Sequence, residues 1–303
     1  MAAVIEIKDV SKHFGPKVAV HRVSFSVQGG QTYGLIGPNG AGKTTTFSMI
    51  CGFLKPTTGS ISVMGSSPSA PGALKGKLGV LPQDAVLPSL WPVGEFLIHL
   101  GRLSSLPDPE SEARRVLERV QLPETWNVQC GALSHGMAKR VALAQALMGK
   151  PPVICLDEPT AGLDPKIAAS IRGLIRELKG EHTVVVSSHN LQELEELCDA
   201  TAILDKGKLI TSGSMAEMTG QTAEFRVQIA KGPVPLEAVK ALSGCRAANL
   251  ENNDSVLVVY FDGQGVQPED IITRTVALLA KEQVLILGVW RGKRLEEKVL
   301  QLT

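Results

Sequence analysis

The stretch Gly37-Pro38-Asn39-Gly40-Ala41-Gly42-Lys43-Thr44 decides how this chain folds. It fits the pattern G-x-x-x-x-G-K-[ST], whose glycines let backbone N–H groups turn inward around a phosphate. Thr32–Ile36 before it has the apolar character of a buried strand, and Lys43–Cys51 after it has that of a helix. This order predicts an anion site at the helix N-terminus, with a merely structural glycine-rich turn as the alternative.

Two side chains of this loop and two acids further along supply the chemistry. Lys43 can reach the β/γ-phosphates of a nucleotide, and the Thr44 hydroxyl is suited to Mg²⁺. The apolar strand Val153–Leu156 ends in Asp157 and Glu158. Open α/β sheets bind ligands at such strand ends. Asp157 can therefore join the Mg²⁺ shell, and Glu158 can orient and deprotonate a water. Taken alone, such acids more often mark a helix start.

Composition narrows the class of protein. The 303 residues suggest roughly two domains. Lys plus Arg number 31 and Asp plus Glu 30, and this balance argues against a chain-wide nucleic-acid surface. The sequence contains no run of about 18 apolar residues, so no membrane span is predicted. Met1–Glu6 does not resemble a secretion signal. The five cysteines form no CxxC pair, which predicts reduced thiols rather than disulfides or zinc.

Turn signals divide the rest of the chain into short units. Prolines from Pro82 onward open a stretch with little strand character, which predicts a helical insert over about 84–150. Strand–helix alternation on either side predicts a mostly parallel sheet. The expected strands are 2–10, 18–27, 60–64, 78–81, 153–156, 183–186, 201–204 and 208–210, and the expected helices are 93–103, 109–120, 134–148, 165–179 and 191–197.

The last part of the chain follows a different order. Gly213–Gln221 has the composition of a linker. Strands at 224–230, 246–250, 255–261 and 284–290 and helices at 235–242 and 268–281 then give the split βαβ pattern of a ferredoxin-like domain. A short helix over Arg294–Leu302 is expected to close the chain.

Over about residues 3–215 the chain resembles the nucleotide-binding subunit of ATP-binding-cassette (ABC) transporters. Gly37–Thr45 resembles the Walker A loop, and Asp157 with Glu158 resembles Walker B. Further matches are Gln83 to the Q-loop, Leu133-Ser134-His135-Gly136-Met137 to the signature, Ala161-Gly162-Leu163-Asp164 to the D-loop, His189 to the switch histidine and Phe14 to the adenine-stacking aromatic.

The resemblance implies both a fold and a division into domains. The implied fold is α/β, with a P-loop (RecA-like) core, an N-terminal antiparallel β subdomain, the helical insert and a small α+β ferredoxin-like C-terminal domain. The implied domains are an ABC ATPase domain over 1–220 and an accessory domain over 221–303. The latter resembles the extension on exporter-type ATPases, with a generic ferredoxin-like domain as the alternative.

The resemblance also assigns roles to single residues. In this family two cassettes sandwich ATP head to tail between one Walker A loop and the partner's signature helix. Glu158, His189 and Gln83 would be catalytic, and Thr44, Gln83 and Asp157 would hold Mg²⁺. The implied ATP-binding set is Phe14, Gly37, Pro38, Asn39, Gly40, Ala41, Gly42, Lys43, Thr44, Thr45, Ser134 and Gly136.

The implied function is ATP hydrolysis at the cytoplasmic side of the cell membrane that drives a separate multi-spanning membrane permease, with export as the expected direction. The partner cassette would be a second copy or a paralogue, and no nucleic acid is expected. His135 and Met137 depart from the usual LSGGQ signature, and Gly162 departs from the usual serine or alanine of the D-loop. A soluble ABC protein acting on DNA or ribosomes and a non-hydrolysing ATP switch are the alternatives.

Overall fold

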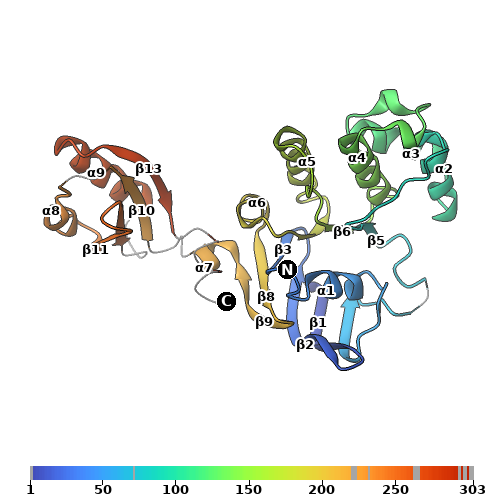
Figure 1. Ribbon diagram of the computed structural model, residues 1–303, viewed down its shortest axis with the longest axis horizontal. Helices are drawn as coiled ribbons and strands as arrows, with labels where there is room; N and C mark the ends of the chain where they lie inside the picture. The colour runs from blue at the N-terminus through green and yellow to red at the C-terminus, as the bar shows by residue number, and fades with distance from the viewer. Residues whose placement is uncertain are drawn as a thin grey trace. The chain divides into compact units, whose positions relative to one another are not determined.

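The computed structural model describes residues 3–70, 72–219, 224–230, 233–261, 267–292, 295 and 299. The chain forms two compact units, Met1–Gly213 and Ser214–Thr303 (Figure 1). Each unit has its own apolar core. The domain boundary expected at residue 220 and most of the closing helix expected at 294–302 lie outside the described residues.

The first unit begins with a small antiparallel sheet. Its order is β2-β1-β4, with β1 at Ala3–Phe14, β2 at Lys17–Gln28 and β4 at Thr58–Val63. We expected β1 to stop near residue 10. It continues to Phe14, which pairs with Lys17 of β2. A register shift lies between Ile7 and Val10, where Asp9 adopts a left-handed conformation with φ 50°. This irregularity interrupts the two-residue alternation on which the expectation rested.

A six-stranded sheet forms the centre of the first unit. The neighbours β5, β6, β7, β3 and β8 pair in parallel, which confirms the predicted mostly parallel sheet. β9 is the next strand after β8. The strands are β3 (Thr32–Ile36), β5 (Leu78–Leu81), β6 (Val153–Asp157), β7 (Thr183–Ser187), β8 (Ala200–Asp205) and β9 (Lys208–Ser214).

Helices connect the strands of this sheet. The predicted helical insert is confirmed, with α2 at Val93–Leu103, α3 at Pro109–Arg119 and α4 at His135–Ala146 gathered beside β5 and β6 (Figure 1). Two short 3₁₀ turns, Pro123–Thr125 and Cys130–Ala132, lie between α3 and α4. The other helices of the unit are α1 (Lys43–Ile50), α5 (Pro165–Glu177) and α6 (Leu191–Leu197).

The second unit has the predicted ferredoxin-like topology. Its sheet order is β11-β12-β10-β13, with all neighbours antiparallel and a core of its own. The elements are β10 (Glu224–Ile229), α8 (Leu236–Lys240), β11 (Cys245–Glu251), β12 (Val256–Phe261), α9 (Pro268–Lys281) and β13 (Ile286–Arg291).

The segment expected to be a linker is partly ordered. β9 continues to Ser214, and α7 follows at Met215–Thr219. Met215 and Met218 are buried, so apolar contacts stabilise this short helix. The division between the two compact units falls between Gly213 and Ser214, within the segment expected to be a linker.

Two other expectations concern the class of protein. Among the described helices, none is long and apolar enough to cross a membrane. All five cysteines are free thiols, and four of them are buried.

Close contact between β5 and α4 makes Gly79 sensitive to substitution. A Cβ at Gly79 would lie 1.8 Å from the carbonyl oxygen of Ala146. We expect Gly79→Ala to lower the free energy of unfolding by about 2–3 kcal/mol, as overpacked sites do, measured by chemical denaturation. Gly173 in α5, where a Cβ would meet nothing within 4 Å, is the matched control. Gly173→Ala should stabilise the protein by about 0.5–1 kcal/mol. An equally stable Gly79→Ala protein would contradict this account of the interface.

Candidate active site

The order of the central sheet brings four distant segments to one edge. β5, β6, β7 and β3 are consecutive parallel neighbours, so their carboxyl ends lie side by side. Gln83 follows β5, Glu158 follows β6, His189 follows β7 and the glycine-rich loop follows β3. A cleft of about 400 Å³ opens there and is lined by Lys17, Val18, Ala19, Asn39, Gly40, Gly42, Lys43, Thr44, Thr45, Gln83, Glu158, Ala161 and His189.

The glycine-rich loop is tightly enclosed at the start of α1. Gly42 is the N-cap of α1 with φ 99°, and a Cβ there would lie 2.8 Å from the carbonyl oxygen of Ala19. Only glycine adopts this conformation without strain. The loop therefore presents the N-terminus of α1 and its unpaired N–H groups to the cleft, which favours an anion.

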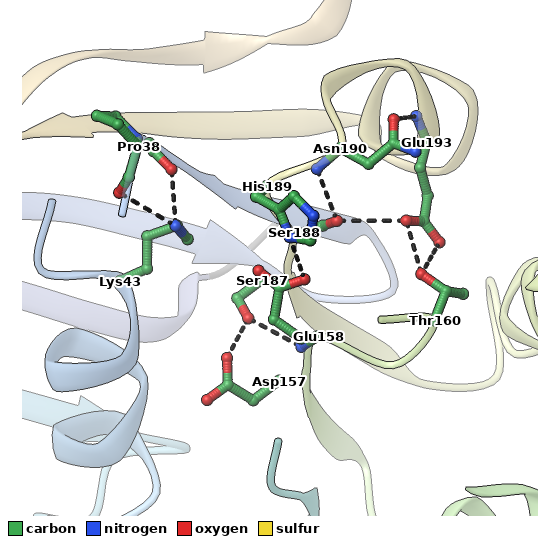
Figure 2. A network of polar contacts seen from close by, with 11 residues as sticks. Pro38, Lys43, Asp157, Glu158, Thr160, Ser187, Ser188, His189, Asn190 and Glu193 are labelled. Atoms are coloured by element: carbon green, nitrogen blue, oxygen red, sulfur yellow. Dashed lines mark hydrogen bonds and ion pairs between the residues drawn. The ribbon is translucent and has the colours of Figure 1, made fainter. Parts of the chain in front are cut away.

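Lys43 lies folded over this loop. Its side chain is buried, and Nζ donates to the carbonyl oxygens of Gly37 at 2.7 Å and Pro38 at 3.3 Å (Figure 2). Burial lowers the pKa of Lys43, whereas the carboxylates of Glu158 and Asp157 raise it. The ammonium group is thus available at the mouth of the loop, held by two neutral acceptors.

Ser187 connects the two acids that end β6. Its hydroxyl donates to Oδ1 of Asp157 and accepts the backbone N–H of Glu158 at 3.1 Å (Figure 2). Asp157 is 3% exposed, and burial raises its pKa, while the Ser187 hydrogen bond and the charges of Lys43 and Lys139 lower it. Sequence reasoning did not single out Ser187, although its place at the end of β7 beside β6 is a usable signal.

Glu158 and His189 form a pair inside the cleft. Oε2 of Glu158 lies 2.9 Å from Nδ1 of His189, and the two side chains are 10% and 62% exposed (Figure 2). Glu158 has φ 48°, a left-handed conformation that is unfavourable for a residue with a long side chain. Residues held in this region of φ are concentrated at functional sites.

The loop that carries His189 is anchored by the buried carboxylate of Glu193. Oε1 and Oε2 of Glu193 accept from the Thr160 hydroxyl at 2.7 and 2.8 Å, and Oε2 also accepts from Ser188 at 3.2 Å. Asn190 caps α6 by accepting the backbone N–H of Glu193 at 3.2 Å (Figure 2). These bonds fix the loops after β6 and β7 relative to each other, and so they fix the Glu158–His189 pair.

Other predicted site residues do not line this cleft. Phe14 is 48% exposed at the end of β1, with Nζ of Lys12 5.2 Å from its ring centroid. Ser134 is the N-cap of α4, as predicted, and accepts the backbone N–H of Met137 at 3.3 Å. Gly136 is the second residue of α4, where a Cβ would be 2.5 Å from Ile167. Four further predicted residues are absent from the lining of the cleft. They are Gly37, Pro38 and Ala41 of the glycine-rich loop and Asp157, which directly precedes Glu158.

The residues proposed to hold Mg²⁺ fit that ion in their chemistry. Mg²⁺ prefers oxygen donors and is commonly held by one or two carboxylates together with substrate phosphates. Thr44 and Gln83 place a hydroxyl and an amide in the cleft. Asp157 directly precedes Glu158, which lines the cleft. In the described part of the chain, no group of three or more His, Cys, Asp or Glu side chains could hold a metal ion by itself. The hydroxyl, amide and carboxylate that are present suit Mg²⁺ bound together with a phosphate ligand.

Lys17, Val18 and Ala19 of β2 also line the cleft, and sequence reasoning missed them. They follow the turn after Phe14, so they enclose the cleft from the antiparallel sheet. No chemical signal distinguishes these residues, because only the pairing of β1 with β2 places them beside the glycine-rich loop.

Comparison with known proteins gives consistent matches. A model of the family described as "ABC transporter" matches residues 20–161. A Nod factor export ATP-binding protein I of Burkholderia lata is 38% identical over 99% of this chain and 97% of its own length. A linearmycin resistance ATP-binding protein LnrL of Bacillus subtilis is 36% identical over 99% of this chain and 98% of its own length.

Solved structures of ATP-binding cassettes match about seven-tenths of the chain. The structure of an ATP-binding subunit of an ABC transporter has a TM-score of 0.65 and 29% identity, and the match covers 72% of this chain and 92% of that one. A dimeric ATP-binding cassette in a post-hydrolysis state with ADP and Pi has a TM-score of 0.63 and 25% identity, over 70% of this chain and 98% of that one. These neighbours, together with the sheets described above, confirm the predicted fold class.

Proposed function

This chain belongs to the ABC transporter family as an ATP-binding subunit, and on that premise we propose that the cleft at the carboxyl edge of its central sheet binds and hydrolyses ATP. The observation that carries the proposal is the 2.9 Å contact between Glu158 and His189 in the cleft that also holds Lys43 and Thr44. A carboxylate paired with an imidazole beside a phosphate loop can position and deprotonate a water.

The triphosphate would lie along the loop from Asn39 to Thr45, where backbone N–H groups and the α1 N-terminus meet its charge. Lys43 would exchange its bonds to the Gly37 and Pro38 carbonyls for the β- and γ-phosphates. Thr44, Gln83 and Asp157 would hold the Mg²⁺, which neutralises charge on the phosphates when bound. Phe14 would stack on the adenine.

Hydrolysis then follows from the geometry of the pair. Glu158 would accept a proton from a water while the oxygen of that water bonds to the γ-phosphorus. The bond between the γ-phosphorus and the β–γ bridging oxygen breaks in the same step. The products are ADP and inorganic phosphate. His189, held against Glu158, would orient the same water and meet the γ-phosphate. The neighbouring Asp157 keeps its separate role because Ser187 binds its Oδ1.

ATP hydrolysis by this subunit drives export through a separate membrane permease, and its cassettes work as dimers. We propose that Ser134 and Gly136 at the start of α4 meet the γ-phosphate bound by the partner cassette. We also propose that the ATPase domain spans about 1–220, that 221–303 is an accessory domain, and that the protein lies peripherally at the cytoplasmic face of the membrane.

Affinity purification from detergent-solubilised membranes of the native host tests this assignment. We expect the tagged chain to recover a multi-spanning protein in about stoichiometric amount, identified by mass spectrometry, because the family works with such a partner. A tagged Lys43→Ala chain processed in parallel shows whether recovery depends on ATP binding. Recovery of ribosomal or DNA-associated proteins, with no membrane protein, would contradict the transporter assignment.

A further inference from the structure

Lys139 is a buried cation that the proposed chemistry does not use. It lies in the second turn of α4 and is 9% exposed. Its Nζ donates to the backbone carbonyl oxygen of Gln83 at 3.3 Å, across 56 positions of the chain. Gln83 stands before the helical insert and α4 is the last helix of that insert. This hydrogen bond therefore connects the two ends of the helical insert at the border of the cleft.

The charge of Lys139 faces the acids of the site without pairing with one. Among the described residues, no carboxylate lies within ion-pair distance of its ammonium group. Burial lowers the pKa of Lys139, and the carboxylates of Asp157, Asp84 and Glu158 raise it. A buried ammonium is unfavourable unless such charges and an acceptor compensate it. Burial is the larger effect, so these carboxylates offset its cost only in part, and the hydrogen bond to the Gln83 carbonyl helps to hold the ammonium group in place.

The cavity around Lys139 continues the cleft. It has a volume of about 500 Å³, and its lining includes Lys139, His135, Gln83 and Ala161. Gln83 and Ala161 also line the ATP cleft, so the two hollows share a wall. A movement of α4 at this wall would be transmitted to Gln83 through the Lys139 bond.

We propose that Lys139 is a positioning residue that holds Gln83 at the cleft and connects its position to the signature helix α4. The inference rests on the function proposed for Gln83. By fixing the Gln83 carbonyl, Lys139 restricts the direction in which the amide side chain enters the cleft. Because Ser134 begins the same helix, the placement of Gln83 then depends on where the signature lies.

Substitution of Lys139 should separate turnover from binding. Loss of a hydrogen bond from a charged group is expected to lower kcat about tenfold in Lys139→Met, with the ATP Kd changed by less than about threefold. Lys139→Arg keeps a cation and a donor and should recover most of the loss. Arg140→Met is the matched control, because Arg140 is a cation of the same helix whose Nη2 donates to Ser170 on α5 at 2.9 Å. Its kcat should stay within about twofold of the wild type, because Arg140 lines neither the cleft nor the cavity beside it.

A double-mutant cycle with Gln83→Ala separates positioning from a merely structural role. If Lys139 acts through the amide of Gln83, adding Lys139→Met to Gln83→Ala should lower kcat by less than about twofold further. A further tenfold loss, as independent sites would give, would overturn the inference while leaving the role of Gln83 intact. Full activity of Gln83→Ala alone would instead overturn the role proposed for Gln83 and this inference with it. Thermal unfolding of each variant, with and without ATP, confirms that the proteins compared are folded.

Discussion

Glu158→Gln is expected to lower ATP turnover about a thousandfold while leaving ATP binding intact, because a positioned general base contributes about 10²- to 10⁴-fold. Glutamine keeps the length of the side chain and can still meet Nδ1 of His189, which lies 2.9 Å from the carboxylate. It cannot accept the proton of the attacking water. ATP should therefore persist in the cleft and hold two cassettes together, seen as a dimer by size-exclusion chromatography with multi-angle light scattering.

Glu110→Gln is a suitable control for that measurement. Glu110 is an exposed acid of α3 in a surface ion pair with Arg114, so neither turnover nor association should change beyond about twofold. Phosphate release is best followed under single-turnover conditions, which separate chemistry from product release. Robust turnover by Glu158→Gln would refute the role assigned to Glu158. An unchanged monomer in ATP would instead refute the dimer-trapping part of the expectation.

Lys43→Ala is expected to weaken ATP binding about a hundredfold. The reason is that Lys43 supplies a buried point charge to the phosphates, and hydrogen bonds from charged groups are worth about 1.5–3 kcal/mol. The variant also removes the bonds from Nζ to the Gly37 and Pro38 carbonyls. Isothermal titration with ATP and Mg²⁺ measures the change directly.

Lys8→Ala serves as the control, since Lys8 is a 68% exposed lysine of β1 paired with Glu6. ATP affinity within about twofold of the wild type is expected for it, because such surface charges contribute little. If Lys43→Ala bound ATP as tightly as the wild type, the triphosphate could not lie along the loop as proposed. A protein that bound ATP normally but failed to hydrolyse it would move Lys43 from binding to the transition state.

Local signals predicted some elements to the residue. The bounds of α2, α6 and α9 agree with those predicted from the sequence. A clear start signal precedes or opens each helix: Pro92 before α2, Asn190 before α6 and Pro268 at the start of α9. The grouping of Gln83, Glu158, His189 and the glycine-rich loop in one cleft agrees with the expected set of site residues. Which of them perform which step is still a prediction.

What sequence reasoning missed depends on tertiary contacts. Ser187 looks like any strand-end serine until β7 pairs with β6 and brings its hydroxyl between Asp157 and Glu158. Lys139 looks like a solvated helix residue until α4 packs beside β5. Met215 and Met218 form a helix only because their side chains find an apolar environment. For Ser187 and Lys139 the deciding partner lies far away in the sequence, where local propensity carries no information.

The left-handed backbone of Glu158 sets stability against catalysis at one position. Strain of this kind costs of order 1–3 kcal/mol, and glycine would relieve it. Mutational drift toward the more stable protein therefore leads away from the carboxylate proposed to deprotonate the attacking water. Without selection for turnover, this single substitution by glycine would give a protein that still dimerises around ATP, has a higher free energy of unfolding than the enzyme and does not hydrolyse ATP.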